Sequence, residues 1–329
     1  MNNVADIRKN NKKEIYRLML DGRRYTKSQV AMGTKLSVAT CNTLLNDMKN
    51  QGIVTGEEKA FGEVGRSSIL YRINEEHESY LAIYPAVKKG TYVVETMVFS
   101  PIGKILFNET KEYDIVDVLQ LEKIVDRHRE IFPSLKHIMI AMPGIVKENI
   151  VRYCDISTLN DVDVKADLEQ KFGIETTIKN DLHFDALGYY KLENRKEEVI
   201  TLAYFPSHIL PGAATIHKGM IIQGESGFAG MMGFLPYGVS RQEQLAMLEP
   251  ETCIPFIAMS VSVNIVLLNP GTIVLTGDLI DEKTLEAVKE TCLKSIPEEY
   301  MPDFIIIDNF KKYLFEGMFQ LALDMKKIM

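Results

Sequence analysis

Asn180 and Asp181 have the side-chain types and the position best suited to chemistry on a small molecule. The pair follows an expected strand and directly precedes a helix predicted over residues 182–190. A carboxylate at such a position can take a proton from a hydroxyl group or hold that hydroxyl by a hydrogen bond. Asn and Asp are also favoured at helix N-caps, so capping is an equally good interpretation, and the two are compatible.

The other side chains with reactive potential stand alone in the sequence. His183 lies on the same expected helix, where a lone histidine is more often structural, and His208 and His217 lie near turns without a partner in the sequence. The four cysteines are far apart and form no CxxC pair, so neither a disulfide framework nor a zinc site is indicated. Free thiols fit a reducing cytosol, and we expect a cytoplasmic protein without a metal.

Length and charge indicate two or three globular domains with different partners. The chain has 329 residues, of which 46% are hydrophobic and 25% charged. Residues 1–74 hold 13 basic and 7 acidic residues, a net charge of +6, whereas the rest holds 25 and 38, a net charge of −13. A basic segment on an acidic body is typical of a nucleic-acid-binding module, and chance asymmetry among solvated surfaces is the alternative. No apolar run approaches membrane-spanning length, so we expect no membrane partner.

The basic segment reads as three helices followed by a wing. Apolar spacing and capping residues predict helices over residues 5–20, from Thr26 to about Gly33, and from Ser37 to about Gln51. A tight glycine turn between the second and third of them makes a helix-turn-helix. Two short strands follow, separated by the polar segment EEKAFGEVGRSS. A three-helix packing module or a protein-binding winged helix is the alternative, but the order of elements and the positive charge favour DNA.

The N-terminal part of the third helix enters the major groove in such a motif. Asn can read adenine bidentately, Thr can contact the thymine methyl group or a phosphate, and Lys pairs with phosphate. An arginine in the wing can enter a narrow, negative minor groove. The candidate DNA-contacting residues are therefore Lys35, Ser37, Thr40, Asn42 and Thr43 on the helix, and Arg66 and Ser67 in the wing.

From Tyr80 onward, strands alternate with helices. Strands are expected over residues 80–84, 92–99, 104–107 and 137–142, with a helix over residues 116–129 before the last of them. The order strand, strand, strand, helix, strand, helix occurs again later in the chain. It implies an α/β fold for this part of the protein.

Four segments of this part resemble the ROK family (repressor, open reading frame, kinase). They are AMPGIVKENIV at 141–151, DLEQKFGIETTIKNDLHFDALGYY at 167–190, GAATIHKGMIIQGESGFAGMMGF at 212–234 and NIVLLNPGTIVLTGDLI at 264–280. The N-terminal module resembles the regulator branch of that family. The resemblance spans nearly the whole chain and implies a two-lobed actin/hexokinase-like (ribonuclease H-like) ATPase fold.

The sequence departs from the family's kinases where they bind phosphate. Those kinases open the domain with D-x-G-G-T, whereas residues 83–91 read IYPAVKKGT and include a proline without an N–H. In the second phosphate segment, Ala213 and Ala214 stand where glycine and threonine are usual. Asp181 matches the family's general base, but a general base accelerates phosphoryl transfer little when the phosphates are not held in place. We therefore expect no enzymatic activity and no cofactor.

The residues that contact sugar and zinc in the family have also changed. Met231 and Phe234 align with a Glu and a His that contact sugar hydroxyls, and that His is also a zinc ligand. A thioether and a phenyl group cannot accept hydrogen bonds from a sugar as a carboxylate and an imidazole can. No cysteine occurs in GVSRQEQLAMLEP, where the family's zinc loop would lie. The candidate effector-binding residues that remain are Asn180, Asp181 and, from a loop that contacts sugar in the family, Ser157, Thr158 and Asn160.

We predict three units: a DNA-binding domain over residues 1–76, a first lobe over residues 77–190 and 300–329, and a second lobe over residues 191–299. We expect a homodimer or homotetramer that presents two heads to pseudo-palindromic double-stranded operator DNA. A sugar or sugar-derived effector in the cleft would alter lobe closure, giving a repressor of carbohydrate-related genes. The alternatives are an atypical sugar kinase with an accessory domain and a scaffold that binds proteins.

Overall fold

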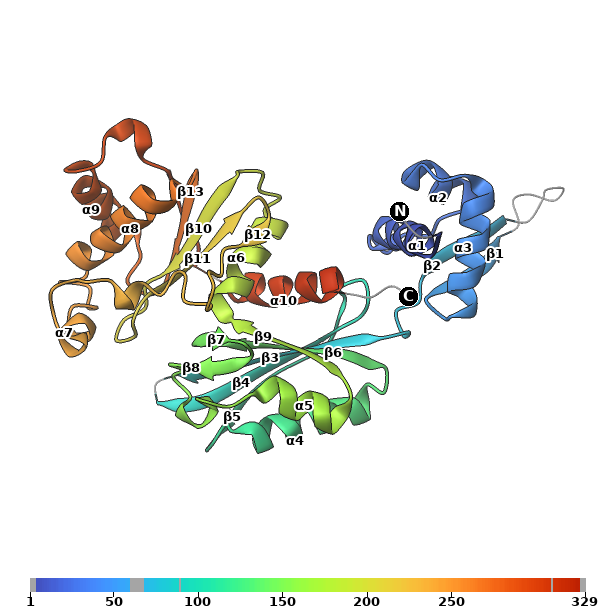
Figure 1. The fold of residues 1–329 in the computed structure, drawn as a ribbon, viewed down its shortest axis with the longest axis horizontal. Helices are drawn as coiled ribbons and strands as arrows, with labels where there is room; N and C mark the ends of the chain where they lie inside the picture. Colours follow the sequence, from blue (N-terminus) through green and yellow to red (C-terminus); the bar gives the residue numbers. More distant parts are fainter. Residues whose placement is uncertain (1–3, 60–67, 89, 309, 326–329) are drawn as a thin grey trace.

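The computed structural model describes residues 4–59, 68–88, 90–308 and 310–325, which form a head and two lobes (Figure 1). The head lies at one end of the molecule, and each lobe is built on a five-stranded sheet. Among the described residues, no helix is long and apolar enough to cross a membrane.

The head contains the three helices and the two strands that the sequence predicts. Thr26 caps the second helix in a capping box with Gln29, and the Ser37 side chain caps the third by accepting from the Thr40 N–H at 3.0 Å. Such side chains satisfy amides that the first turn of a helix leaves unbonded, which is why these helices begin there. The elements are α1 (Val4–Met19), α2 (Lys27–Thr34), α3 (Val38–Asn50), β1 (Val54–Lys59) and β2 (Ser68–Ile73).

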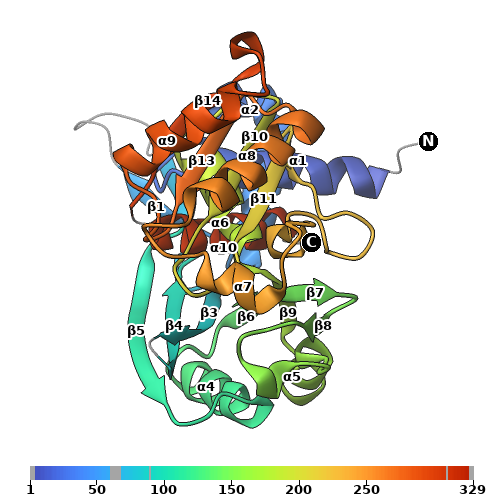
Figure 2. The same cartoon turned by 90° about the vertical axis from the view of Figure 1, so that its left-hand side faces the viewer.

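The first lobe has the strand order β5-β4-β3-β6-β9. Alternate residues of β6 pack into different cores: Ile138 and Ile140 pack with α4 and α5, and Met139 packs toward α10. Because both faces of the sheet are covered, β6 is nearly all apolar. Figure 2 shows α4 and α5 on the outer face. The elements are β3 (Ser79–Lys88), β4 (Thr91–Phe99), β5 (Ile105–Tyr113), α4 (Val118–Ile131), β6 (Leu135–Met142), β7 (Ile145–Lys147), β8 (Ile150–Arg152), η1 (Ser157–Leu159), α5 (Val164–Phe172) and β9 (Glu175–Asn180).

The second lobe has the strand order β12-β11-β10-β13-β14. The last strand, β14, pairs in parallel with β13, so residues 303–306 belong to this sheet and not to the first lobe, where the boundary expected at residue 300 would put them. The chain returns to the first lobe only after β14. The elements are β10 (Val199–Tyr204), β11 (Gly212–His217), β12 (Met220–Ile221), η2 (Met232–Phe234), α7 (Arg241–Ala246), α8 (Ile254–Leu268), β13 (Thr272–Thr276), α9 (Glu282–Leu293), η3 (Glu298–Tyr300) and β14 (Asp303–Ile306).

Two helices, α6 (Asp181–Leu192) and α10 (Lys311–Met325), lie between the two sheets and pack on each other (Figures 1 and 2). They cross with their backbones in contact. A Cβ atom at Gly188 would lie 1.8 Å from the carbonyl oxygen of Tyr313, and one at Gly317 would lie 1.9 Å from that of Phe184. Only glycine fits at both positions, so the crossing admits no other residue without a shift of the helices.

A small joint connects the head to the first lobe. The Tyr16 hydroxyl on α1 donates to the carbonyl oxygen of Pro101 at 3.3 Å, in the turn between β4 and β5. Beside it, the Tyr80 hydroxyl donates to the buried Glu78 carboxylate at 2.5 Å. Leu323, near the end of α10, packs against both the core of the head and that of the first lobe. The joint therefore consists of a polar contact and an apolar one.

Candidate functional site

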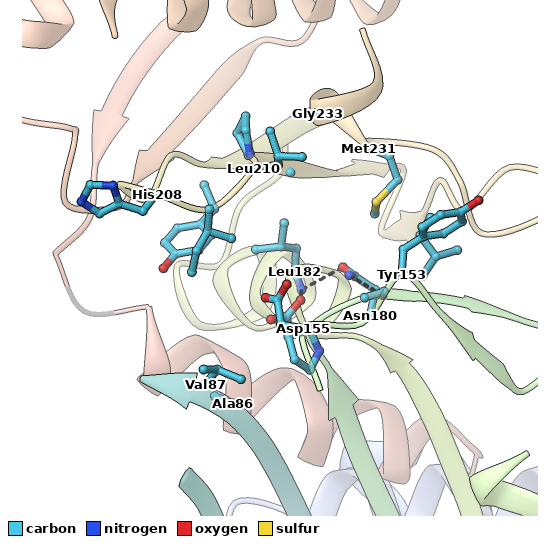
Figure 3. Close-up of a pocket in the computed structure, with 18 of the residues that line it drawn as sticks. Ala86, Val87, Tyr153, Asp155, Asn180, Leu182, His208, Leu210, Met231 and Gly233 are labelled. Atoms are coloured by element: carbon cyan, nitrogen blue, oxygen red, sulfur yellow. Dashed lines mark hydrogen bonds between the residues drawn. The ribbon is translucent and has the colours of Figure 1, made fainter. Parts of the chain in front are cut away.

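A pocket of about 440 Å³ lies between the two lobes. Its volume is in the range of small-molecule sites. Figure 3 shows Asp155 and Asn180, which come from the first lobe, facing Met231 and Leu210 from the second. Its lining also includes residues of β3, of the first turn of α6 and of the start of α10.

Asn180 and Asp181 divide the two roles that the sequence left open. Asn180 is the N-cap of α6: its side-chain oxygen accepts from the Leu182 N–H at 3.0 Å, and its amide donates to the Gly144 carbonyl at 2.9 Å. Asp181 occupies the first helical position and lines the pocket. Burial raises the pKa of its carboxyl to about 7, against the opposing hydrogen bond from the Leu182 N–H. The carboxyl can therefore donate or accept a hydrogen bond near neutral pH.

Two more titratable groups lie on the next turn of α6, away from the pocket lining. Asp185 is 1% exposed, and neither of its carboxyl oxygens has a hydrogen-bond partner among the described residues. Burial, and then the charge of Asp181, raise its pKa well above the ordinary value. Burial lowers the pKa of His183 to about 4, so that histidine is neutral at pH 7. Burial disfavours the charged forms of Asp185 and His183, as it does that of Asp181, whose pKa the charge of Asp155 also raises.

The structure does not bring Ser157, Thr158 and Asn160 into the pocket lining. The Thr158 hydroxyl donates to the carbonyl oxygen of Val116 at 2.5 Å. The Asn160 side chain accepts from the N–H of Cys154 at 2.9 Å and donates to the Cys154 carbonyl at 3.1 Å. These bonds fold the loop around η1 on itself. The sequence assigned the loop to the effector by resemblance, whereas Asp155, just before it, is the residue that lines the pocket.

The end of β3 forms a regular strand where the family's kinases have a phosphate loop. The ladder with β4 continues through Pro85 and Val94 to Lys88 and Thr91. On its other side β3 pairs with β6 only up to Ile83, and Pro85 has no N–H to offer a phosphate. Lys88 and Lys311, both pocket residues, bind the buried carboxylate of Glu95 at 2.5 and 2.8 Å. Their charge is therefore partly neutralised.

The predicted DNA-contacting residues lie on one side of the head, but Asn42 does not face outward with the others. Lys35, Ser37 and Thr43 are exposed, and Thr40 is half-buried. Asn42 is also half-buried, and its side-chain oxygen accepts a hydrogen bond from the Lys27 ammonium on α2. Its oxygen is thus already committed to holding α2 and α3 together.

Asn46 is a further polar residue of α3, not among the predicted contacts, whose side-chain oxygen accepts from the Tyr71 hydroxyl and whose amide donates to Asn42, both at 3.4 Å. It is exposed and lies three residues after Thr43 and seven after Ala39, which are also exposed, so the three share one face of the helix. Helical spacing from Thr43 was the signal that could have found it. Arg66 and Ser67, the predicted wing contacts, lie outside the described residues.

Part of the basic charge of the head is used internally. Arg8 and Lys12 both bind Asp47 at 2.8 Å, and Arg24 binds Glu57 at 2.7 Å. Within the described part of the chain, no ion pair forms at four other lysines of the head, which are Lys9, Lys13, Lys35 and Lys49. Positive charge that is not paired in this way is available to an anionic partner.

Two five-stranded α/β lobes with a small-molecule pocket between them define the two-lobed class of actin/hexokinase-like proteins. The model of the ROK family matches residues 84–254, more than half of the chain, and the protein belongs to that family. It is 25% identical over 246 residues to a putative xylose repressor of Caldicellulosiruptor sp. (strain Rt8B.4), covering 71% of this chain and 60% of that protein. It is also 23% identical to the xylose repressor of Staphylococcus xylosus, covering 68% and 59%. The chain thus spans about 60% of the length of these relatives.

Solved structures share the fold. A ROK family transcriptional regulator, described as a homolog of the E. coli MLC protein, superposes with a TM-score of 0.67 and 14% identity, covering 96% of this chain and 99% of that one. A ROK family glucokinase from Streptomyces griseus, in complex with glucose and AMPPNP, has a TM-score of 0.55 and 12% identity and covers 73% of this chain and 98% of that one. The regulator's match extends over the head as well as the lobes.

The raised pKa of Asp181 predicts how stability depends on pH. The unfolded carboxyl titrates near its ordinary value of about 3.9, and the folded one near 7. Between these values the folded state binds more protons, so the free energy of unfolding should fall as pH rises from about 4 to 7. Asp181→Asn should reduce this fall, by a few kcal/mol at most because one pKa unit corresponds to about 1.36 kcal/mol.

Urea unfolding across this pH range measures the effect. The exposed Asp303 on β14 serves as the control, since Asp303→Asn should leave the slope unchanged. An identical pH slope in Asp181→Asn and the unmodified protein would contradict the assignment.

Proposed function

We propose that the protein is a DNA-binding transcriptional repressor of carbohydrate-related genes that senses a small effector in the cleft between its lobes. One observation carries the proposal: a basic head with an exposed helix face is joined to a body whose pocket retains Asp181 and has a regular strand in place of a phosphate loop. The similarity to proteins named xylose repressors supports xylose or a related sugar as the effector.

The exposed face of α3 is the proposed reading surface. Thr43 and Asn46 are the side chains placed to reach base edges, while Lys35 and Lys49 supply phosphate contacts. A homodimer would present two such helices to half-sites about 34 Å apart, one turn of the duplex. Asn42 was predicted from the sequence to contact a base. We propose instead that it positions α3 against α2.

The helix pair α6 and α10 is proposed to connect the pocket to the head. Asp181 lies in the pocket at the start of α6, and Lys311 lies there at the start of α10. The close crossing at Gly188 and Gly317 makes the two helices move as a unit, because neither backbone can yield. At its other end, α10 contacts the core of the head through Leu323. An effector that binds one arrangement of the lobes more tightly would thereby favour one position of the head.

An atypical sugar kinase is the second candidate, because Asp181 occupies the position of the family's general base. Such an enzyme needs its phosphates and metal held in place. Here β3 pairs regularly with β4 where such a kinase has a phosphate loop, and the two pocket lysines share Glu95. These observations favour the regulator.

Asn46→Ala should weaken binding to a specific operator, selected from a randomised duplex library, by about 10-fold or more. A lost base contact costs about 1–3 kcal/mol, and non-specific binding should change little. Fluorescence anisotropy against selected and unrelated duplexes measures both. Asn42→Ala, one turn away on the same helix, gives the comparison: because Asn42 is proposed to position α3 against α2, its loss should weaken binding to both duplexes together. An equal loss on the two duplexes for Asn46→Ala would assign that side chain to phosphate and not to a base.

Tyr16→Phe should reduce the response to effector while leaving operator binding without effector within about threefold. The substitution removes the hydroxyl that reaches Pro101 and also hydrogen-bonds Tyr80, and each hydrogen bond of this kind contributes about 1 kcal/mol. The measurement is operator affinity with and without xylose. Tyr25→Phe is the control, because the Tyr25 hydroxyl binds Asp21 within the head at 2.5 Å. A full response in Tyr16→Phe would remove the joint from the proposed path.

ATP with Mg²⁺ should not raise the melting temperature, alone or together with xylose, because the pocket offers no cradle for three phosphates. Differential scanning fluorimetry measures the shift, and a ligand at 100 times its Kd stabilises by about 2.7 kcal/mol. A clear upward shift with ATP, accompanied by sugar-dependent turnover, would favour the kinase.

A further inference from the structure

Three large aromatic rings contact each other at the edge of the pocket, and we call them the aromatic cluster. Tyr153 follows β8 in the first lobe, whereas Phe228 and Phe234 belong to the second lobe. The ring of Phe234 lies 5.6 Å from that of Tyr153 and 5.0 Å from that of Phe228. The three side chains are 69%, 44% and 40% exposed, in the order Tyr153, Phe228, Phe234. The cluster therefore joins the lobes without being part of a buried core.

The backbone of Tyr153 has an unusual conformation. Its φ is +49°, a left-handed conformation that bulky residues rarely adopt and that costs about 1–3 kcal/mol. Figure 3 shows the Tyr153 ring beside Met231 at the edge of the pocket. Strain of this kind is retained where surrounding structure or function requires it.

The pocket is chemically divided. On one side, the carboxyls of Asp155 and Asp181 can accept hydrogen bonds from hydroxyl or amino groups. On the other, Met231, Phe234 and Tyr153 present a thioether and two rings. The Arg241 guanidinium lies 4.4 Å from the centre of the Phe234 ring, a cation–π contact that supports one face of the wall. A flat apolar group can stack on such rings.

We propose that the cleft takes an amphipathic ligand, in which a polyol or sugar ring binds Asp155 and Asp181 and a planar apolar group, as in an aryl glycoside, stacks on the aromatic cluster. The inference rests on the proposed function, since it takes the cleft as the effector site, and it names the chemical class of the effector. A ring stacked against the exposed surfaces of Tyr153 and Phe234 would touch both lobes at once. Its binding would therefore depend on the distance between them, as an effector's must.

The test compares matched glycosides on the full-length protein. Isothermal titration is carried out with the methyl and phenyl β-glycosides of xylose, glucose and galactose. For a sugar that binds, the phenyl glycoside should bind about 3- to 10-fold more tightly than the methyl glycoside, since aromatic pairs contribute about 0.5–1.5 kcal/mol. Tyr153→Ala should reduce this ratio to below about twofold and leave the affinity for the methyl glycoside nearly unchanged.

Two further variants separate the loss of an aromatic ring from a general disturbance of the fold. Phe234→Leu retains apolar volume without a ring, so it should also lower the phenyl preference even if a smaller side chain there would disturb folding. Tyr300→Ala is the control, because Tyr300 is 57% exposed and lies outside the pocket lining. It should leave the preference intact.

The outcomes test the aromatic subsite and the repressor function independently. A phenyl preference that survives Tyr153→Ala, equal affinities for the two glycosides, or no binding of any phenyl glycoside would overturn the aromatic subsite. Operator binding is measured in parallel. Failure of DNA binding with an intact phenyl preference would count against the repressor alone, and intact DNA binding without that preference would count against the subsite alone.

Discussion

The contact between the backbones of α6 and α10 determines how the rest of the molecule is arranged. At Gly188 and Gly317 the two helices touch without side chains between them, so their relative position has little freedom. One end of this pair forms part of the cleft, with Asp181 and Lys311, and the other end reaches the head through Leu323. Two sheets are packed on a rigid pair of helices, and moving that pair is one way in which a change at the cleft can reach the head, beside the contact of Tyr16 with Pro101.

The cleft keeps the fold's ligand pocket while its chemistry has changed. β3 pairs with β4 through Pro85, which has no N–H, and Glu95 engages both lysines that face the pocket. Burial raises the pKa of Asp181 to about 7 and that of Asp185 well above its ordinary value. These features suit a site that holds hydroxyl groups and responds to lobe position better than one that transfers a phosphoryl group.

In the head, charge is divided between stability and binding. Asp47 and Glu57 pair with several arginines and lysines, so the excess of basic residues is larger in the sequence than on the surface offered to DNA. The exposed face of α3 carries short polar side chains and unpaired lysines. Phosphate contacts would fix the orientation of the head, and the few polar groups at the centre of the face would read bases.

Helical and strand periodicity, capping residues and the order of motifs were enough to predict the three helices of the head, the two α/β lobes and the family, because these features are local or depend on segment order. The residue-level site was predicted less well. Asn42 and Asn46 differ little in sequence, and only the packing of α2 on α3 decides which one faces outward. Likewise, β14 joins the second sheet through pairing with a strand about thirty residues earlier. The aromatic cluster unites Tyr153 with Phe234 from opposite lobes, and no pattern along the chain encodes that distance, because it is set by how the lobes pack on α6 and α10.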